Sequence, residues 1–264
     1  MPTSAPKSRH SGRIIRVISH MGERLERPIR LEEMAAIANL SPFHFDRIFR
    51  DVTGLSAAAF QAALRLQHAK SAILMTTRSI VEISTDLGYE SVGSFTTRFT
   101  RAVGVSPRTL RKGVSALRDR DVAAMFHDRA RARVVNAAHA AVTVTFASLP
   151  APGAIVWIGL FAKGIPDGVP VAGTMASGTT TATLARVPPG SYRCLAAAYQ
   201  PSANILDYLL SNAHAKISTP TVEINASAEP VNLRLTFRTP AITDPPVLLA
   251  MPLQRACGAN AVGD

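Results

Sequence analysis

Two stretches of this chain repeat one sixteen-residue pattern, and the repeat limits the folds that the chain can adopt. The first copy reads SPFHFDRIFRDVTGLS over residues 41–56, and the second reads SVGSFTTRFTRAVGVS over residues 91–106. A shift of fifty positions aligns residues that pack, cap or turn: Phe45 with Phe95, Phe49 with Phe99, Gly54 with Gly104, Ser56 with Ser106 and, upstream, Leu31 with Val81, Glu32 with Glu82 and Ile37 with Leu87. The sequence therefore predicts one structural unit that is built twice.

Each copy has the local signals of a helix that follows a turn. Ser41 suits the N-cap and Pro42 the first helical position, where a missing N–H costs nothing, and Gly54 is typical of a C-terminal cap. Phe45 and Phe49 lie four residues apart, so they share a helix face that we expect to be buried. The outward positions are then 43, 46, 47 and 50 in the first copy and 93, 96, 97, 100 and 101 in the second.

Positive charge is concentrated in the half of the chain that carries the repeat. Residues 1–135 hold 22 Lys or Arg against 12 Asp or Glu, a net charge of +10, whereas residues 136–264 hold 7 against 6, a net charge of +1. This asymmetry indicates that the first half meets a polyanion, with nucleic acid the leading candidate and an anionic membrane surface the second. No apolar run approaches the ~20 residues of a membrane span, and no apolar segment near the N-terminus is typical of a secretion signal. We expect a cytoplasmic protein with no membrane partner.

Beyond residue 141 the hydrophobic period changes from that of helices to that of strands. Apolar and polar residues alternate over residues 142–147 and 231–238, which is typical of half-buried strands. The run AIVWIGLFA over residues 154–162 is apolar at both parities and predicts a central strand covered on both faces. About seven short strands separated by turn signals favour a β-sandwich, with a helical excursion over residues 206–213.

Few residues point to catalysis or to metal binding. Cys194 and Cys257 are the only cysteines, so they give no disulfide framework, which fits a reducing compartment. Cys194 alternates with Tyr192 and Ala196 in an expected strand, which favours a buried core thiol over a reactive one. The C-terminal half has no close acid pair, nucleophile elbow or phosphate loop, and no histidine pair has metal spacing with a cysteine partner. We therefore expect no catalytic residue, no metal and no cofactor.

The repeat and its flanks resemble the AraC/XylS-type bacterial transcription regulators. The resemblance covers residues 13–112 and rests on LSPFHFDRIFRDVTGLS and on SIVEISTDLGYESVGSFTTRFTRAVGVSPRTLRK. It implies a seven-helix unit with two helix-turn-helix motifs that binds promoter DNA in a sequence-specific way. The expected fold class is thus multidomain, an all-α unit followed by an all-β sandwich. The expected order is a disordered tail (1–12), the DNA-binding domain (13–112), a linker or helix (113–140), the sandwich for an effector or for dimerisation (141–253) and a tail (254–264).

The outward helix faces of the two copies form the candidate DNA-binding surface. A helix fits the major groove, and two helices about 34 Å apart can enter successive grooves on one side of B-DNA. The candidate base-reading residues are Phe43, His44, Asp46, Arg47, Thr96 and Thr97. The candidate phosphate ligands are Arg50, Arg98, Arg101, Arg108, Arg111 and Lys112. A structural role stays open for Asp46 and Arg50, because their spacing also suits a surface ion pair.

The second copy departs from what the resemblance leads us to expect. Val92 and Gly93 stand where long polar side chains are common, and Thr97 stands where arginine is common. Ala57, after the first copy, replaces a frequent proline. We expect the first motif to do more of the direct base reading and the second to contribute mainly backbone contacts.

For the β-rich region the sequence leaves several roles open. Four aromatic residues are candidates to line a small-molecule pocket, although aromatic residues in a sandwich are more often plain core: Trp157, Tyr192, Tyr199 and Tyr208. Effector binding ranks slightly ahead of dimerisation alone. The expected partner is double-stranded DNA, and RNA polymerase, an effector and a second copy of the chain are further candidates. The alternative function is a DNA-localised protein-interaction module, and an enzyme is the least favoured class.

Overall fold

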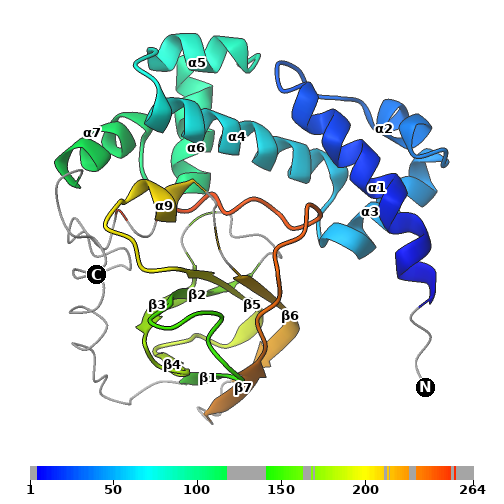
Figure 1. Ribbon diagram of the computed structural model, residues 1–264. Coiled ribbons are helices and arrows are strands. Elements are labelled where there is room, and N and C mark those ends of the chain that lie inside the picture. Colours follow the sequence, from blue (N-terminus) through cyan, green and yellow to red (C-terminus); the bar gives the residue numbers. More distant parts are fainter. Residues whose placement is uncertain are drawn as a thin grey trace. The chain divides into compact units, whose positions relative to one another are not determined.

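The computed structural model describes residues 5–117, 141–162, 168, 170–210, 213, 215–225, 230–250 and 253. Its contacts divide the chain into two compact units, Met1–Arg98 with Ala241–Leu248, and Phe99–Pro240 with Leu249–Asp264. Within the described ranges, helices fill the first part of the chain and two β-sheets the second, as Figure 1 shows. The predicted fold class, an α-helical unit followed by a β-rich one, is confirmed.

Helices occupy almost all of the described N-terminal region. Their bounds are α1 (Ala5–Glu23), α2 (Leu31–Ile37), α3 (Pro42–Thr53), α4 (Ala57–Met75), α5 (Ile80–Asp86), α6 (Val92–Val103) and α7 (Pro107–Leu117). The pairs α2–α3 and α5–α6 are the two helix-turn-helix motifs. The expected disordered tail over residues 1–12 is wrong for residues 5–12, because α1 begins at Ala5. Pro6 lies in its first turn, where proline is tolerated.

The two copies of the repeat bury the same aromatic positions. Phe45 and Phe49 of α3 have no exposed surface, and neither do Phe95 and Phe99 of α6. The ring of Phe49 packs edge to face on Phe60 of α4, with the ring centroids 5.6 Å apart. Burial of these phenylalanines fixes which side of each helix remains available to a partner.

Helix α4 holds the loop between α1 and α2 and the turn between α5 and α6. The Gln61 side-chain oxygen accepts a hydrogen bond from the Ile29 backbone N–H at 3.0 Å, and the Arg65 Nε donates to the Leu25 carbonyl oxygen at 3.0 Å. The Arg65 Nη2 also donates to the Leu87 carbonyl oxygen, and its guanidinium lies 5.0 Å from the ring centroid of Tyr89. Because Arg65 is only 7% exposed, these contacts satisfy a buried cation and link the loop after α1 to the turn between α5 and α6.

The turns of the two motifs differ by one residue. In the first turn the Leu40 N–H donates to the Ala35 carbonyl oxygen, and in the second the Tyr89 N–H donates to that of Ser84, a shift of 49. The buried positions agree with this shift, since Met34, Ala35 and Ala38 correspond to Ile83, Ser84 and Leu87. The fifty-residue alignment is therefore wrong upstream of the turns, and it holds from Ser41 and Ser91 onward. The extra residue lies in the second turn, between the left-handed Gly88 and the start of α6.

The β-rich region consists of two sheets. The strands are β1 (Val142–Phe146), β2 (Ile155–Phe161), β3 (Ala172–Ser177), β4 (Thr181–Leu184), β5 (Gly190–Tyr199), β6 (Ala215–Ile224) and β7 (Val231–Leu235), with the short α9 (Leu206–Leu209) before β6. One sheet has the order β4-β1-β7 and the other β3-β2-β5-β6. The β1–β7 pair is parallel, and the other pairs are antiparallel. All seven residues of β2 are buried, as expected for a central strand.

The two sheets share one apolar core, as the sandwich prediction requires. Val144 of β1, Ile158 of β2 and Cys194 of β5 belong to the same buried cluster, so the facing sides of the sheets pack together. Burial raises the pKa of the Cys194 thiol to about 12, which keeps it protonated and unreactive at neutral pH. The prediction of a buried core thiol is consistent with this environment.

The segment Ala241–Leu248 groups with the helices rather than with the sandwich. Lys70 of α4 is 2% exposed, and its Nζ donates to the backbone oxygens of Val247 at 3.1 Å and Leu248 at 3.0 Å. Burial lowers the pKa of Lys70 from 10.5 to about 7. The expectation that residues 141–253 form one sandwich domain is thus wrong for 241–248, because the buried lysine takes its acceptors from this segment.

Of the remaining domain predictions, the linker falls mostly outside the described residues. Residues 113–117 belong to α7, and residues 118–140 and 254–264 lie outside the described part. In the part of the chain that the structure describes, no helix is long and apolar enough to cross a membrane.

Candidate nucleic-acid interface

The outer face of α3 presents long side chains to solvent. Phe43 is 84% exposed at the start of the helix, and Arg47 and Arg50 are exposed one and two turns later. His44 and Asp46 are half-buried at the edges of this face. The Ser41 N-cap makes no side-chain capping bond, and the left-handed Gly54 closes the helix with its N–H on the Arg50 carbonyl oxygen. Backbone conformation and backbone hydrogen bonds therefore determine where the helix ends. Burial of Phe45 and Phe49 on one side determines which residues of the helix face solvent.

Two side-chain pairs order this face. The Arg50 Nε donates to Asp46 Oδ2 at 2.9 Å, which is the i,i+4 pair that the spacing allowed. The Arg47 Nη2 donates to His44 Nδ1 at 3.2 Å. Because Arg50 neutralises the carboxylate of Asp46, the face carries less repulsion toward phosphate than its composition suggests.

The outer face of α6 carries shorter side chains at the positions equivalent to Phe43, Asp46 and Arg47 of α3. Gly93 and Thr97 are exposed and Thr96 is half-buried, and the Thr97 hydroxyl donates to the Gly93 carbonyl oxygen at 3.0 Å. This bond uses the only hydroxyl hydrogen of Thr97 inside its own helix. Arg98 and Arg101 are the long exposed side chains of α6. The two motifs therefore share a scaffold and differ in what they offer a partner.

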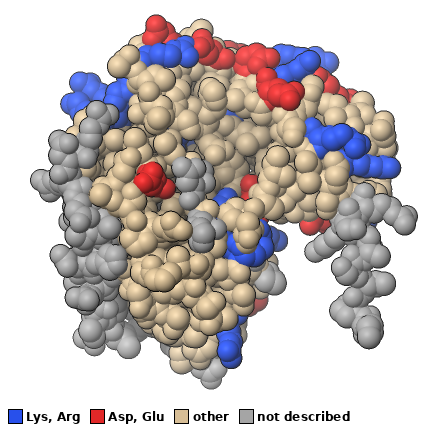
Figure 2. Space-filling model, in the orientation of Figure 1, with Lys and Arg blue, Asp and Glu red and all other residues tan. Residues whose placement is uncertain are grey.

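The candidate phosphate ligands lie at the surface of the helices. Arg50, Arg98, Arg101, Arg108 and Lys112 are exposed, and Arg111 is half-buried. On the face that Figure 2 shows, basic and acidic side chains are interspersed, so charge alone does not mark out an interface there. A candidate interface is therefore marked by the side chains that α3 and α6 expose rather than by charge alone.

The four aromatic residues proposed to line a pocket do not share one face of their sheet. Tyr192 is part of the core between the sheets, whereas Trp157 and Tyr199 point to the opposite side of the β3-β2-β5-β6 sheet. Tyr199 and Tyr208 pack with ring centroids 5.7 Å apart, and the Tyr208 hydroxyl donates to the Ser202 carbonyl oxygen at 3.0 Å. All four are at least 93% buried, so they pack as core rather than as an open pocket lining.

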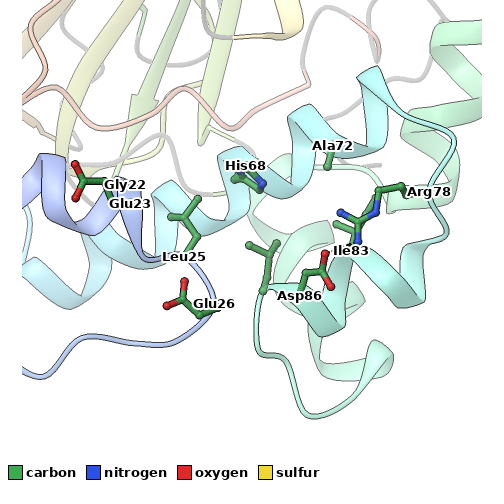
Figure 3. Close-up of a pocket in the computed structure, with 10 residues that line it drawn as sticks. Gly22, Glu23, Leu25, Glu26, His68, Ala72, Arg78, Ile83 and Asp86 are labelled. Atoms are coloured by element: carbon green, nitrogen blue, oxygen red, sulfur yellow. Dashed lines mark hydrogen bonds and ion pairs between the residues drawn. The ribbon is translucent and has the colours of Figure 1, made fainter.

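A concave site lies between α1, α4 and α5, as Figure 3 shows. Its volume is about 260 Å³, and its lining mixes charged and apolar side chains: Gly22, Glu23, Leu25, Glu26, His68, Ala72, Arg78, Ile83, Asp86 and Leu87. Arg78 and Asp86 form an ion pair across it, which raises the pKa of the Arg78 guanidinium. No group of three or more His, Cys, Asp or Glu suited to a metal ion occurs among the residues that the structure describes. No local sequence pattern predicts this hollow, because its lining comes from three helices and the loops beside them.

Comparison with known families identifies part of the helical region. A family described as a helix-turn-helix domain matches residues 34–113. Residues 34–113 are an AraC-type helix-turn-helix domain. The predicted resemblance to AraC/XylS-type regulators is thereby confirmed for these residues, as an AraC-type DNA-binding domain.

Curated proteins similar to part of this chain include transcription regulators and an origin-binding protein. The regulator GlxA of Rhizobium meliloti (strain 1021) is 32% identical over 99 residues, which are 38% of this chain and 31% of the relative. The right origin-binding protein of Escherichia coli (strain K12) is 33% identical over 88 residues, 33% of this chain and 30% of the relative. The chain thus spans about a third of the length of these relatives.

Solved structures of DNA-binding proteins match about two fifths of this chain. The DNA-binding domain of AdpA in complex with a target DNA is 27% identical, and the match covers 39% of this chain and 94% of that one with a TM-score of 0.37. An AraC-type regulator from Chromobacterium violaceum is 23% identical over 40% of this chain and 94% of that one, with a TM-score of 0.38.

Proposed function

We propose that this chain is a sequence-specific transcription regulator in which α3 and α6 enter successive major grooves of promoter DNA. The observation that carries the proposal is the shared frame of the two helices. Each buries a pair of phenylalanines four residues apart and turns the opposite face to solvent. A duplicated frame with two different outer faces suits the reading of two different base sequences.

In this proposal the two motifs divide the work. On α3, Arg47 is the main base-reading residue, since a guanidinium can bind guanine in a bidentate manner, and Phe43 contacts a thymine methyl group. His44 and Asp46 contribute to base reading indirectly. His44 holds the side chain of Arg47, and Asp46 holds that of Arg50. On α6, Thr96 and Thr97 add less, because Thr97 already donates to its own helix. The phosphate ligands are Arg50, Arg98, Arg101, Arg108, Arg111 and Lys112.

Substitution of Arg47 is expected to relax base preference at one half-site. Arg47→Ala should reduce discrimination at the base pair that Arg47 contacts by about 5- to 100-fold, the value of one bidentate contact. Thr97→Ala, the equivalent position of the second motif, should change base preference less. In-vitro site selection with the wild type and both variants measures this. If Arg47→Ala weakens base preference equally at both half-sites, or does not weaken it at all, α3 is not the main base-reading helix.

Binding should also weaken steeply with salt. If the six phosphate ligands all contact the backbone, the slope of log affinity against log salt approaches −5, at ~0.9 per phosphate. Lys112→Gln should reduce the magnitude of the slope by about one and leave base preference unchanged. Fluorescence anisotropy with one cognate duplex at several salt concentrations measures the slope. A slope near −1 would show that these cations do not contact phosphate.

The β-rich region is proposed to modulate DNA binding through a small-molecule effector, a second copy of the chain or contact with RNA polymerase. An effector need only favour one arrangement by a few kcal/mol to act as a switch. The alternative function is a module that binds another protein while DNA binding localises it. None of the strongly exposed large apolar residues in the described part lies on a strand, which favours the first reading. Sizing of the purified protein with and without cognate DNA separates dimerisation from effector binding.

A further inference from the structure

A histidine outside the recognition helix packs against its base-reading face. His10 lies on α1, and its ring meets the ring of His44 on α3 edge to face, with centroids 6.1 Å apart and planes at 85°. His10 is half-buried, and its Nδ1 is buried without a hydrogen-bond partner in the described part of the chain. A buried polar atom without a partner costs stability, so the packing of this ring is not explained by its own hydrogen bonding.

His44 passes this contact on to Arg47. The Nδ1 of His44 accepts a hydrogen bond from Arg47 Nη2 at 3.2 Å, so this nitrogen carries no proton and the ring orientation matters. A rotation of the His44 ring would move the acceptor away from the guanidinium. The ring of His10 packs against that ring, so a rotation of His44 would have to disrupt this contact.

A free arginine side chain loses considerable rotamer freedom when it binds a base edge. An arginine that is already held near its binding position loses less, and preorganisation of this kind improves affinity and discrimination without a new contact. Arg47 is exposed, and the bond to His44 holds its guanidinium against α3. The chain His10–His44–Arg47 therefore joins α1 to the outer face of α3.

We propose that His10 is a positioning residue for base recognition by Arg47. It acts through the ring of His44 and does not itself touch DNA. This inference rests on the proposed function, because it assigns to His10 an effect on the same base pair that Arg47 reads.

The experiment compares His10→Ala, His10→Phe, Arg47→Ala and the double variant His10→Ala with Arg47→Ala in the full chain. For each, affinity is measured on the selected site and on duplexes changed at single base pairs, together with the salt slope. His10→Ala should reduce discrimination at the Arg47 base pair by roughly three- to tenfold, less than the loss of Arg47 itself, and leave other base pairs and the salt slope unchanged. His10→Phe retains a ring and should keep most of the discrimination.

The double variant isolates the path through Arg47. In the Arg47→Ala background, His10→Ala should change discrimination no further. If His10→Ala weakens binding to all duplexes equally, or lowers discrimination equally with and without Arg47, its role is only structural and the inference fails. If Arg47→Ala alters base preference while His10→Ala does not, the inference fails and the proposed function stands. If Arg47→Ala alters no base preference, the assignment of Arg47 fails and the inference fails with it.

Discussion

Gly88→Ala is expected to lower the free energy of unfolding of the helical unit by about 3 kcal/mol or more. Gly88 has a φ of +66°, and a Cβ at this position would lie 1.9 Å from the Glu26 carbonyl oxygen. The Glu26 carbonyl belongs to the backbone, and the backbone also fixes the position of the Cβ. Neither group can therefore move aside as the end of a flexible side chain would. The loop after α1 must separate from the turn of the second motif, and the hydrogen bonds of Arg65 to Leu25 and Leu87 would be strained together.

The first motif supplies a matched control for this substitution. Asn39 is the structural equivalent of Gly88, with a φ of +53°, and it already carries a Cβ. Asn39→Ala therefore tests the left-handed backbone without a clash, and we expect a loss of about 1 kcal/mol. Urea denaturation of the full chain, followed by far-UV circular dichroism, measures both variants. Equal losses would mean that the contact with Glu26 contributes nothing.

Lys70→Met should remove a pH dependence of stability that the wild type shows above neutral pH. The folded-state pKa of Lys70 is lowered to about 7 by burial, against 10.5 without it. Between these values the unfolded chain binds a proton that the folded chain lacks, so the free energy of unfolding rises with pH. The rise is at most about 1.4 kcal/mol per pH unit, and it is lost as the pH falls toward 7. In Lys70→Met this contribution is absent.

The comparison between wild type and variant isolates Lys70 from other buried groups. Burial raises the pKa values of Cys194 and Tyr199, so these groups lower stability at alkaline pH. Their effect is the same in both proteins and cancels in the difference. Urea denaturation at several values between pH 7 and pH 9 measures that difference, with Lys112→Met as a surface control. Parallel curves for wild type and Lys70→Met would show that Lys70 enters the folded state with an ordinary proton affinity.

Much of the helical fold was predictable because local rules and periodicity agree there. The burial of Phe45 and Phe49 follows from their spacing, and the ends of α3 follow from Pro42 and Gly54. The alternation over residues 142–146 likewise matches the burial of β1. The exposed set on α3, with Phe43 and Arg47 outermost, could be derived from the same helical period.

What the sequence did not predict depends on contacts between distant residues. The one-residue difference between the turns is hidden in the sequence. With a shift of fifty positions Glu32 aligns with Glu82 by coincidence, although the structure requires a shift of 49 upstream of the turns. Lys70 and Val247 are 177 positions apart, and no local pattern pairs a lysine with a carbonyl so far away. The parallel pairing of β1 with β7 and the meeting of His10 with His44 are of the same kind.

The return of residues 241–248 to α4 means that the helical unit is not continuous along the chain. A gene fragment that stops after α7 would encode every helix of both motifs and still leave Lys70 without its two carbonyl acceptors. Anyone seeking a minimal DNA-binding fragment would have to supply that stretch in trans, graft it on by a short linker, or replace Lys70 with an apolar side chain.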